Sequence, residues 1–382
     1  MNSRNVILVV VIAIIVASVI YLEGQKVAPP TTVQPEPPGA PQAQGEPITP
    51  PVPPTPDAQA KASKYSMAPE LSGIVGYINA EEGLKIADFR GKVVLIDFWT
   101  YSCINCLRTL PFLKEWHRKY ADEGLVIIGV HTPEFEFEKE YDNVKSFMMK
   151  NGIEYRVVQD NDYATWRAFK NRFWPRKYLI DADGFIRYDH IGEGAYDETE
   201  EKIQELLEEA GMTNMTRVPL AALEDLTPRI QLTPELYAGY EFALPRGQNV
   251  ANSGGMVPEA TIAYDLKGII ADDAILLNGS WKSNPDNLQA VRDGGIVALS
   301  YQAHDVNIVA DSLNGPLTVV VTLDDKPIPQ ERAGTDIQSK DGTSYIVVDE
   351  PQLYNVVHGD YGRHTVRFFV PTDFTFHAFT FG

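Results

Sequence analysis

The chain has 382 residues, of which 44% are hydrophobic and 10% aromatic, and this length predicts two globular domains rather than one core. Its 52 acidic residues outnumber the 33 basic ones, which gives a net charge of −19. Such a charge excludes nucleic acid as a partner, because the surface cannot neutralise phosphates.

An apolar run near the N-terminus predicts the compartment. Residues 6–22 follow Arg4 and contain no charged side chain before Glu23. As a helix rising ~1.5 Å per residue, the run would be about 25 Å long, just enough to cross a bilayer core. Only a weak cleavage site follows, so residues 1–26 are expected to form an uncleaved signal anchor rather than a removable signal peptide. The basic residue on the short N-terminal side predicts a single-pass protein of the cell membrane, with its domains on the extracytoplasmic side.

Residues 27–65 read as a linker. The stretch from Ala28 to Pro56 is dense in proline and has few aliphatic residues. It cannot build a core, so an extended spacer is expected between the membrane and the first domain.

Residues 66–211 alternate between strand-like and helix-like patterns. The runs 91–99 and 124–132 are short, apolar and rich in β-branched residues, as buried strands are, and each precedes a helical stretch. A hairpin is predicted to turn at Asp183-Gly184, and an amphipathic helix over 196–211 closes the segment. This order predicts an α/β sandwich with a mixed sheet.

The chain's 2 cysteines lie where the first strand passes into a helix. Cys103 at the helix N-terminus would meet unpaired N–H groups and the positive end of the helix dipole, which favour the thiolate and make it the nucleophile. Cys106, one turn later, can attack a mixed disulfide from within the protein. Asp97 interrupts an apolar strand, and its burial should raise its pKa and let it carry the proton of Cys106. The alternative for Asp97 is a strand-end carboxylate facing water.

Other uses of the cysteine pair are less consistent with the sequence. A zinc site needs four ligands, and the 7 histidines are scattered, with no pair at metal-binding spacing near a cysteine. A disulfide closing so short a loop would constrain the unfolded chain little. Redox chemistry without a metal or other cofactor is the interpretation that remains.

The segment resembles the thioredoxin superfamily, in particular the TlpA-like redoxins and the soluble C-terminal part of DipZ-type proteins. The cysteine pair, Asp97 six residues before it, Pro111 eight residues after Cys103, and Trp174-Pro175 before the hairpin carry the resemblance. It implies a catalytic cis-proline at Pro175 facing the cysteines. We expect Trp174, Trp99 and Thr100 to bind the substrate.

The resemblance also suggests the direction of electron flow. TlpA-like proteins mostly reduce disulfides, so reduction of client proteins is the expected activity. The polytopic electron-transfer domain of DipZ-type proteins is missing from this sequence, so a separate membrane donor of the CcdA/DsbD type is expected to supply electrons.

Two alternatives stay open. Thr100 lies three residues before Cys103, as in the peroxiredoxin pattern, but Ile96 stands where that pattern has proline, and no matching arginine can be placed. A non-catalytic surface-binding protein is the other alternative. The loop with His131 and Glu134 is expected to take no part in catalysis.

Residues 212–235 form a proline-containing connector, and the pattern of residues 236–382 is entirely β. Eight or so short strands with turn signals predict a jelly roll or two-sheet β-sandwich, with a hairpin at the sequence TLDDKPI. The layout resembles carbohydrate-binding modules, and Trp281, Tyr301 and Tyr354 are candidates for stacking on sugars. A docking domain that helps select the redox partner is the preferred interpretation over glycan binding.

Overall fold

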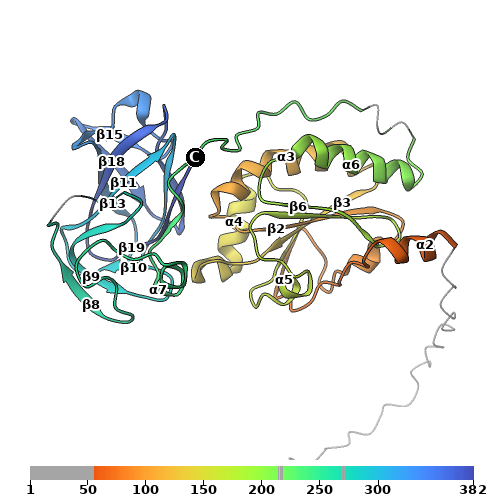
Figure 1. The fold of residues 1–382 in the computed structure, drawn as a ribbon, viewed down its shortest axis with the longest axis horizontal. Helices are drawn as coiled ribbons and strands as arrows, with labels where there is room; N and C mark the ends of the chain where they lie inside the picture. The colour runs from red at the N-terminus through yellow and green to blue at the C-terminus, as the bar shows by residue number, and fades with distance from the viewer. Residues whose placement is uncertain (1–55, 214, 216–217, 268–269, 271) are drawn as a thin grey trace, which may run out of the picture. The chain divides into compact units, whose positions relative to one another are not determined.

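The computed structural model describes residues 56–382, except 214, 216–217, 268–269 and 271 (Figure 1). The predicted signal anchor and residues 27–55 of the predicted linker lie outside these residues, and Pro56–Lys64, at the end of that linker, form a helix rather than an extended spacer. Within the described ranges, no helix has the length and apolar character needed to span a membrane. The described residues contain two β-sheets, one of six strands and one of thirteen.

The first sheet is mixed, as the sequence predicts, with strand order β1-β4-β3-β2-β5-β6. Strands β2, β3 and β4 are parallel, whereas β1, β5 and β6 pair antiparallel with their neighbours. The strands are β1 (Gly76–Ile78), β2 (Val93–Trp99), β3 (Leu125–His131), β4 (Arg156–Gln159), β5 (Arg176–Ile180) and β6 (Ile186–Ile191).

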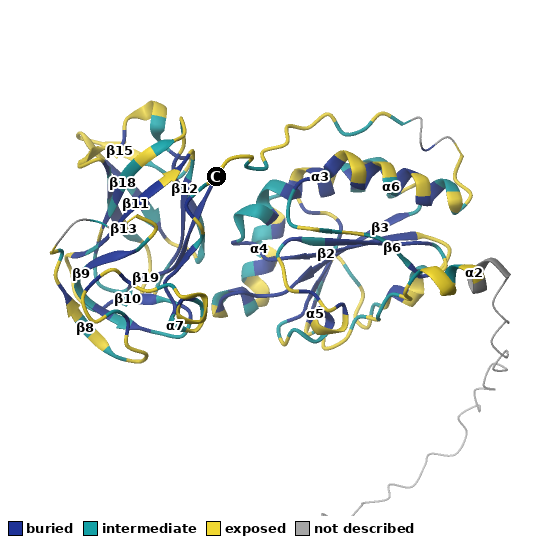
Figure 2. Ribbon diagram, viewed as in Figure 1, coloured by how far each residue is buried: buried dark blue, intermediate teal, exposed yellow. Residues whose placement is uncertain are grey.

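Helices cover both faces of this sheet (Figure 1). Side chains of α3, α4 and α6 share one hydrophobic cluster with the sheet, and α5 and the 3-10 helix η1 share another on the opposite face. Every residue of β2 and β3 is buried as a result (Figure 2). The helices are α2 (Pro56–Lys64), η1 (Ile86–Phe89), α3 (Ile104–Tyr120), η2 (Glu136–Lys139), α4 (Tyr141–Lys150), α5 (Ala164–Ala168) and α6 (Tyr196–Glu209).

The second sheet has more strands than the sequence predicted. They are β7 (Leu236–Tyr237), β8 (Thr261–Tyr264), β9 (Leu276–Ser283), β10 (Leu288–Ala290), β11 (Gly295–Ala303), β12 (Val306–Ser312), β13 (Leu317–Leu323), β14 (Lys326–Pro327), β15 (Gln338–Lys340), β16 (Thr343–Val348), β17 (Gln352–Val357), β18 (Gly362–Val370) and β19 (Phe374–Phe381). Short helices also occur, against expectation: α7 (Tyr240–Ala243), η4 (Leu244–Arg246) and η5 (Gln330–Arg332). The predicted hairpin joins β13 and β14, where Asp324 and Asp325 both adopt positive φ.

Strand β9 pairs with β11 over its first residues and with β8 and β10 over its later residues, and so connects two parts of the second sheet. Its first residues, Leu276–Asn278, pair with β11, and its last residues, 281–283, pair with β10. Between them Gly279 has φ +91°, a conformation that costs glycine little. The two sheets of the predicted sandwich are therefore joined by hydrogen bonds through a strand that bends at a glycine.

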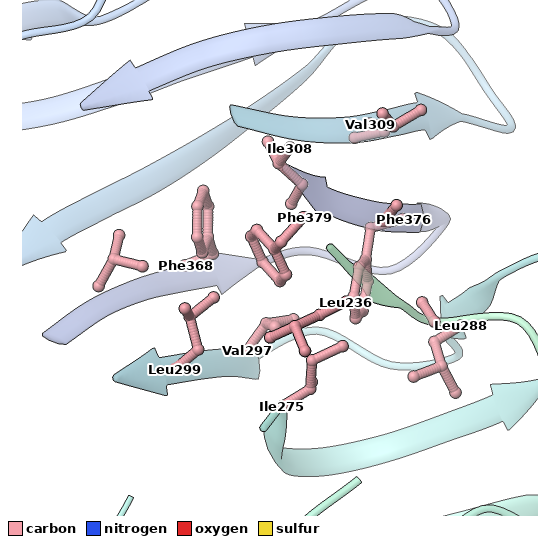
Figure 3. Packing of buried hydrophobic residues seen from close by; sticks show 14 of the residues in the cluster. Leu236, Ile275, Leu288, Val297, Leu299, Ile308, Val309, Phe368, Phe376 and Phe379 are labelled. Carbon is pink, nitrogen blue, oxygen red and sulfur yellow. The ribbon is translucent and has the colours of Figure 1, made fainter. Parts of the chain in front are cut away.

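Side chains from the part of the sheet that contains β11 and β18 and from the part that contains β10 and β19 meet in one apolar core (Figure 3). The rings of Phe368 in β18 and Phe379 in β19 lie 5.4 Å apart, centroid to centroid. Trp281, Tyr301 and Tyr354 are also buried here, with 1%, 1% and 2% of their surface exposed. These three candidates for sugar stacking are therefore excluded, because a ligand from solvent cannot reach them.

Candidate active site

The two cysteines lie between the end of β2 and the first turn of α3. Cys103 is the N-cap of α3, and its carbonyl oxygen accepts a hydrogen bond from the N–H of Leu107 at 3.0 Å. It is partly exposed, whereas Cys106 is 3% exposed, and both are free thiols. A partner in solution can therefore reach the first sulfur, and the second lies behind it.

Cys103 lies at the N-terminus of α3, toward which the positive end of the helix dipole points, and the first turn of α3 contains no acidic side chain. Burial raises the pKa of the Cys106 thiol well above its usual value, and its hydrogen bond with Cys103 and the charges of Cys103 and Asp97 raise it further. Cys106 therefore needs a proton acceptor before it can act as a nucleophile.

Asp97 lies in the middle of β2, on the face covered by α3. It is 1% exposed, and its Oδ1 atom has no hydrogen-bond partner. Burial raises the pKa of this carboxyl to about 7, although the positive charge of Lys177 opposes the shift. The alternative of a carboxylate facing water is thus wrong, because the side chain points into the packed layer between β2 and α3.

The Trp174–Pro175 peptide bond is cis, in agreement with the resemblance. Pro175 is buried and Trp174 is half-buried, and the Trp174 Nε1 atom donates a hydrogen bond to the carbonyl of Thr132 at 3.0 Å. The preceding residue, Phe173, is 47% exposed. Sequence reasoning missed Phe173, although its place next to Trp174-Pro175 was a usable signal.

Two of the predicted substrate-binding residues are not accessible to a client. Trp99 is 2% exposed and Thr100 is fully buried, because the residues that follow β2 still pack against β3 and its loop. The Trp99 ring lies 5.2 Å from the ring of His131, and Thr100 Oγ1 lies 3.4 Å from His131 Nε2. The prediction that Trp99 and Thr100 bind the substrate is corrected accordingly: both are buried against His131, next to the turn between β2 and α3 that carries the two cysteines (the cysteine turn).

His131 is a buried imidazole beside Trp99 and Thr100. It is fully buried at the end of β3, and burial lowers its pKa to about 3, so the imidazole is neutral. That the loop with His131 and Glu134 takes no part in catalysis stays a prediction.

Glu138 forms hydrogen bonds next to the cysteine turn, and the sequence did not indicate this. It is fully buried and accepts hydrogen bonds from the hydroxyl of Ser102 and from the N–H groups of Glu134 and Phe135. The residue just before Cys103 is thereby connected to the loop after β3. No sequence motif marks Glu138, since it is one of several glutamates in the stretch EFEFEKE.

The part of the chain that the structure describes contains no group of three or more His, Cys, Asp or Glu residues that could bind a metal ion. The chemistry available at the cysteine turn is that of two thiols, a buried carboxyl and a buried amine.

Two family models match separate parts of the chain. The model described as "AhpC/TSA family" matches residues 66–189, and the model described as "Thioredoxin like C-terminal domain" matches residues 233–382. The first contains the two cysteines and the buried carboxyl of Asp97, and the second contains all strands of the thirteen-stranded sheet.

Two curated relatives are similar to part of the chain. Protein DipZ of Mycobacterium bovis is 39% identical over 274 residues, which cover 71% of this chain and 38% of DipZ. The chain thus spans about two fifths of the length of that relative. The thiol-disulfide oxidoreductase YkuV of Bacillus subtilis is 29% identical over 141 residues, which cover 37% of this chain and 94% of YkuV.

Two solved structures are similar to somewhat more than a third of the chain. The solution structure of a thioredoxin-like protein in the oxidised form is 29% identical and covers 38% of this chain and 97% of its own, with a TM-score of 0.35. A thiol-disulfide isomerase from Corynebacterium glutamicum is 24% identical and covers 37% of this chain and 96% of its own, with a TM-score of 0.34.

Proposed function

The chain belongs to the thioredoxin superfamily, and from this premise we propose that it is a thiol–disulfide oxidoreductase whose redox couple is Cys103 and Cys106. One observation carries the proposal: a partly exposed thiol caps a helix, and a buried thiol lies one turn behind it, near a carboxyl with a raised pKa. A structural cysteine pair would need neither the exposed sulfur nor the buried acid.

The reaction proceeds in two exchanges of sulfur partners. The Cys103 thiolate attacks one sulfur of a client disulfide, and the other client sulfur leaves with the electron pair and takes a proton from water. Asp97 then accepts the proton of Cys106, and the Cys106 sulfur attacks Cys103 in the mixed disulfide. The second client thiol is released, the client has gained two electrons, and the protein is left with a Cys103–Cys106 disulfide.

We infer that Trp174, Phe173 and the neighbouring Pro175 form the client-binding edge of the site. Phe173 offers an exposed ring, and the hydrogen bond of Trp174 to the loop after β3 fixes its half-buried ring. An extended client segment can pack against such rings while its disulfide lies over Cys103.

The reducing direction, the anchor and the donor are further parts of the proposal. The resemblance to TlpA-like proteins supports reduction of client disulfides, and the apolar run at 6–22 supports attachment to the cell membrane from the extracytoplasmic side. An oxidised Cys103–Cys106 pair then needs electrons from a membrane protein of the CcdA/DsbD type.

We propose that residues 66–211 form the catalytic domain and residues 236–382 a domain that helps select clients. Trp281, Tyr301 and Tyr354 are buried and therefore cannot stack on a sugar from solvent. Their burial supports protein docking over glycan binding. Binding of the full-length protein to a soluble polysaccharide would contradict this assignment.

Trapping the mixed disulfide tests the proposed function. The Cys106→Ser variant lacks the resolving sulfur, so incubation with a peptide containing one disulfide should give a covalent peptide adduct at Cys103, detected by mass spectrometry. The matched Cys103→Ser variant retains only the buried thiol and should give none. An absence of adduct in Cys106→Ser would overturn the proposal.

A second candidate, thiol peroxidase activity, follows from the match to the AhpC/TSA model and the position of Thr100. The burial of Thr100 speaks against it. Consumption of hydrogen peroxide by the dithiol form, at a rate exceeding that of disulfide reduction, would favour this candidate over the first.

A further inference from the structure

Arg108 is a charged side chain near the cysteine turn to which the proposed reaction assigns no role. It lies in α3, shortly after Cys106, and its Nε and Nη2 atoms donate hydrogen bonds to the two carboxylate oxygens of Glu193, at 2.7 and 3.0 Å. The two side chains are only 10% and 11% exposed. The Nη2 atom also donates a hydrogen bond to the Oδ1 atom of Asn105 at 2.8 Å. Arg108 therefore binds both Glu193 and a residue that lies between the two cysteines.

Glu193 belongs to the loop between β6 and α6. Its neighbours Gly192 and Gly194 both have φ +83°, a conformation that favours glycine, so the shape of the loop depends on these two residues. The N–H group of Gly192 donates a hydrogen bond to the carbonyl of Pro175 at 2.8 Å. The loop that carries Glu193 is thus bound directly to the cis-proline of the client-binding edge.

These contacts connect the start of α3 to the client-binding edge. Strand β5 begins next to Pro175, and its pairing with β2 fixes its place in the sheet. Helix α3 instead lies on one face of the sheet, so no strand pairing fixes the position of its first turn. The pair of Arg108 and Glu193 provides a direct polar link between that turn and the loop bound to Pro175.

The chemistry of this link indicates what it supplies. Two charges that are buried together lose their water, and apolar side chains of similar volume often stabilise a protein as well as such a pair does. An arginine that binds a carboxylate through two parallel hydrogen bonds, however, fixes the relative orientation of the two groups. The buried pair of Arg108 and Glu193 therefore favours a role in placement over a role in stability.

We propose that Arg108 is a positioning residue for the attack on the client: its pair with Glu193 holds the first turn of α3, and with it Cys103, at the place that a bound client disulfide requires. This inference rests on the proposed function and on its client-binding edge. A client segment that packs along the edge presents its sulfur at one place, so Cys103 must lie within reach of that place. A small disulfide that does not bind the edge has no such requirement. Arg108 itself exchanges no proton or electron.

Two disulfides with the same leaving group separate placement from the reactivity of the thiol. One is dithiodipyridine, a small neutral reagent, and the other is a short neutral peptide whose single cysteine carries a pyridylthio group. In both reactions the Cys103 thiolate bonds to one sulfur, and the other sulfur leaves with the electron pair, takes a proton from water and is detected by absorbance as thiopyridone. Full-length protein with Cys106→Ser stops at this step. The readout is the rate constant for the peptide divided by that for dithiodipyridine.

Loss of the arginine should lower this ratio. Arg108→Met is expected to lower it roughly tenfold or more, since a displacement of about 1 Å from the productive geometry can slow a reaction by about a hundredfold. Arg118→Met is the matched control and should leave the ratio unchanged, because Arg118 forms the same two hydrogen bonds with Glu115 of α3 but is largely exposed. Arg108→Lys keeps the charge without the two parallel hydrogen bonds and should recover only part of the ratio. Full recovery by lysine would overturn the inference, because charge alone would then be sufficient.

Glu193→Gln covers the case in which Arg108→Met does not fold. Glutamine has nearly the same shape as glutamate but only one acceptor oxygen, so the ratio should fall in the same direction. Adding Glu193→Gln to Arg108→Met should lower the ratio no further, because both changes act on one contact. Effects that multiply would overturn the inference, as would an unchanged ratio in a folded Glu193→Gln variant.

The same measurements distinguish the inference from the proposed function. If Cys106→Ser forms no adduct with the peptide, the proposed function fails. If the adduct forms and Arg108→Met leaves the ratio unchanged, only the role of Arg108 is overturned.

Discussion

Asp97 is the only charged residue in β2, and it is buried. Burial of an ionised carboxylate lowers the free energy of unfolding. In the unfolded chain an aspartate has a pKa of about 3.9, whereas burial raises the pKa of Asp97 to about 7. Between these values the folded protein holds a proton that the unfolded protein lacks. Stability contributed by this group is therefore full below about pH 4 and is lost as the pH rises toward about 7.

Asp97→Asn should thus stabilise the reduced protein in a pH-dependent way. The expected gain in the free energy of unfolding is roughly 2–4 kcal/mol at about pH 8, shrinking toward zero near pH 4, because each unit of pKa shift corresponds to about 1.4 kcal/mol. Urea unfolding at several pH values measures the gain. Asp142→Asn, at an exposed position in α4, is the control and should show no such trend. A gain that is equal at both pH values would contradict the buried-carboxyl account.

At the scale of single residues, the sequence was sufficient where a residue's role depends on its spacing from neighbouring residues in the chain. Cys103 and Cys106 were identifiable from the strand-to-helix junction, and the burial of Asp97 from the apolar residues around it. The position of Lys177 opposite Asp97 could not be predicted, because it depends on the pairing of β2 with β5, strands that are far apart in the chain. The exposure of a residue such as Thr100 likewise depends on tertiary packing, which a local pattern does not contain.

At the scale of elements, strand β9 decides how the second sheet is built. Gly279 lies where β9 leaves its pairing with β11 and turns toward β10, and its φ of +91° is one that other residues rarely adopt. A Cβ atom added there would lie 3.2 Å from the Cα atom of Gly295. The sequence predicted strands and turns, but not this bend, because a lone glycine in a β pattern does not reveal which two strands it connects.

Substitution of Gly279 by alanine should therefore cost more than the same substitution at Gly294. Gly294 also has a positive φ, +81°, but a Cβ atom there would meet nothing within 4 Å. We expect Gly294→Ala to lower the free energy of unfolding by about 1 kcal/mol and Gly279→Ala by about 2–3 kcal/mol, because only the latter adds a backbone contact to the unfavourable dihedral angle. Chemical denaturation of the two variants measures the difference. Equal costs would mean that the dihedral angle alone matters at Gly279.

At the scale of the whole molecule, the mixed sheet and the division into an α/β region and a β region followed from the sequence pattern, since strand-helix alternation and uninterrupted strands leave different periodicities, whereas the order of the strands did not. The net charge of −19 is a property of the same scale. A long-range field of this sign attracts positively charged partners and repels negative ones, and salt screens it over a Debye length of about 8 Å at physiological ionic strength. Client selection should therefore have a component that depends on charge and salt, in addition to the contacts at Phe173 and Trp174.

Two disulfide peptides of equal length, one flanked by lysines and one by glutamates, test this component. At about 20 mM ionic strength, the reduced protein should react with the basic peptide roughly three to ten times faster than with the acidic one, as judged by the rate of peptide thiol release. At about 500 mM the ratio should fall toward one, because the field is screened before the peptide reaches Cys103. A neutral peptide of the same length should show little dependence on salt and controls for effects on the chemical step. A preference that persists unchanged at high salt would instead mean that charge is recognised by direct contacts at the client-binding edge. A faster reaction of the acidic peptide at low salt would contradict electrostatic steering by the net charge.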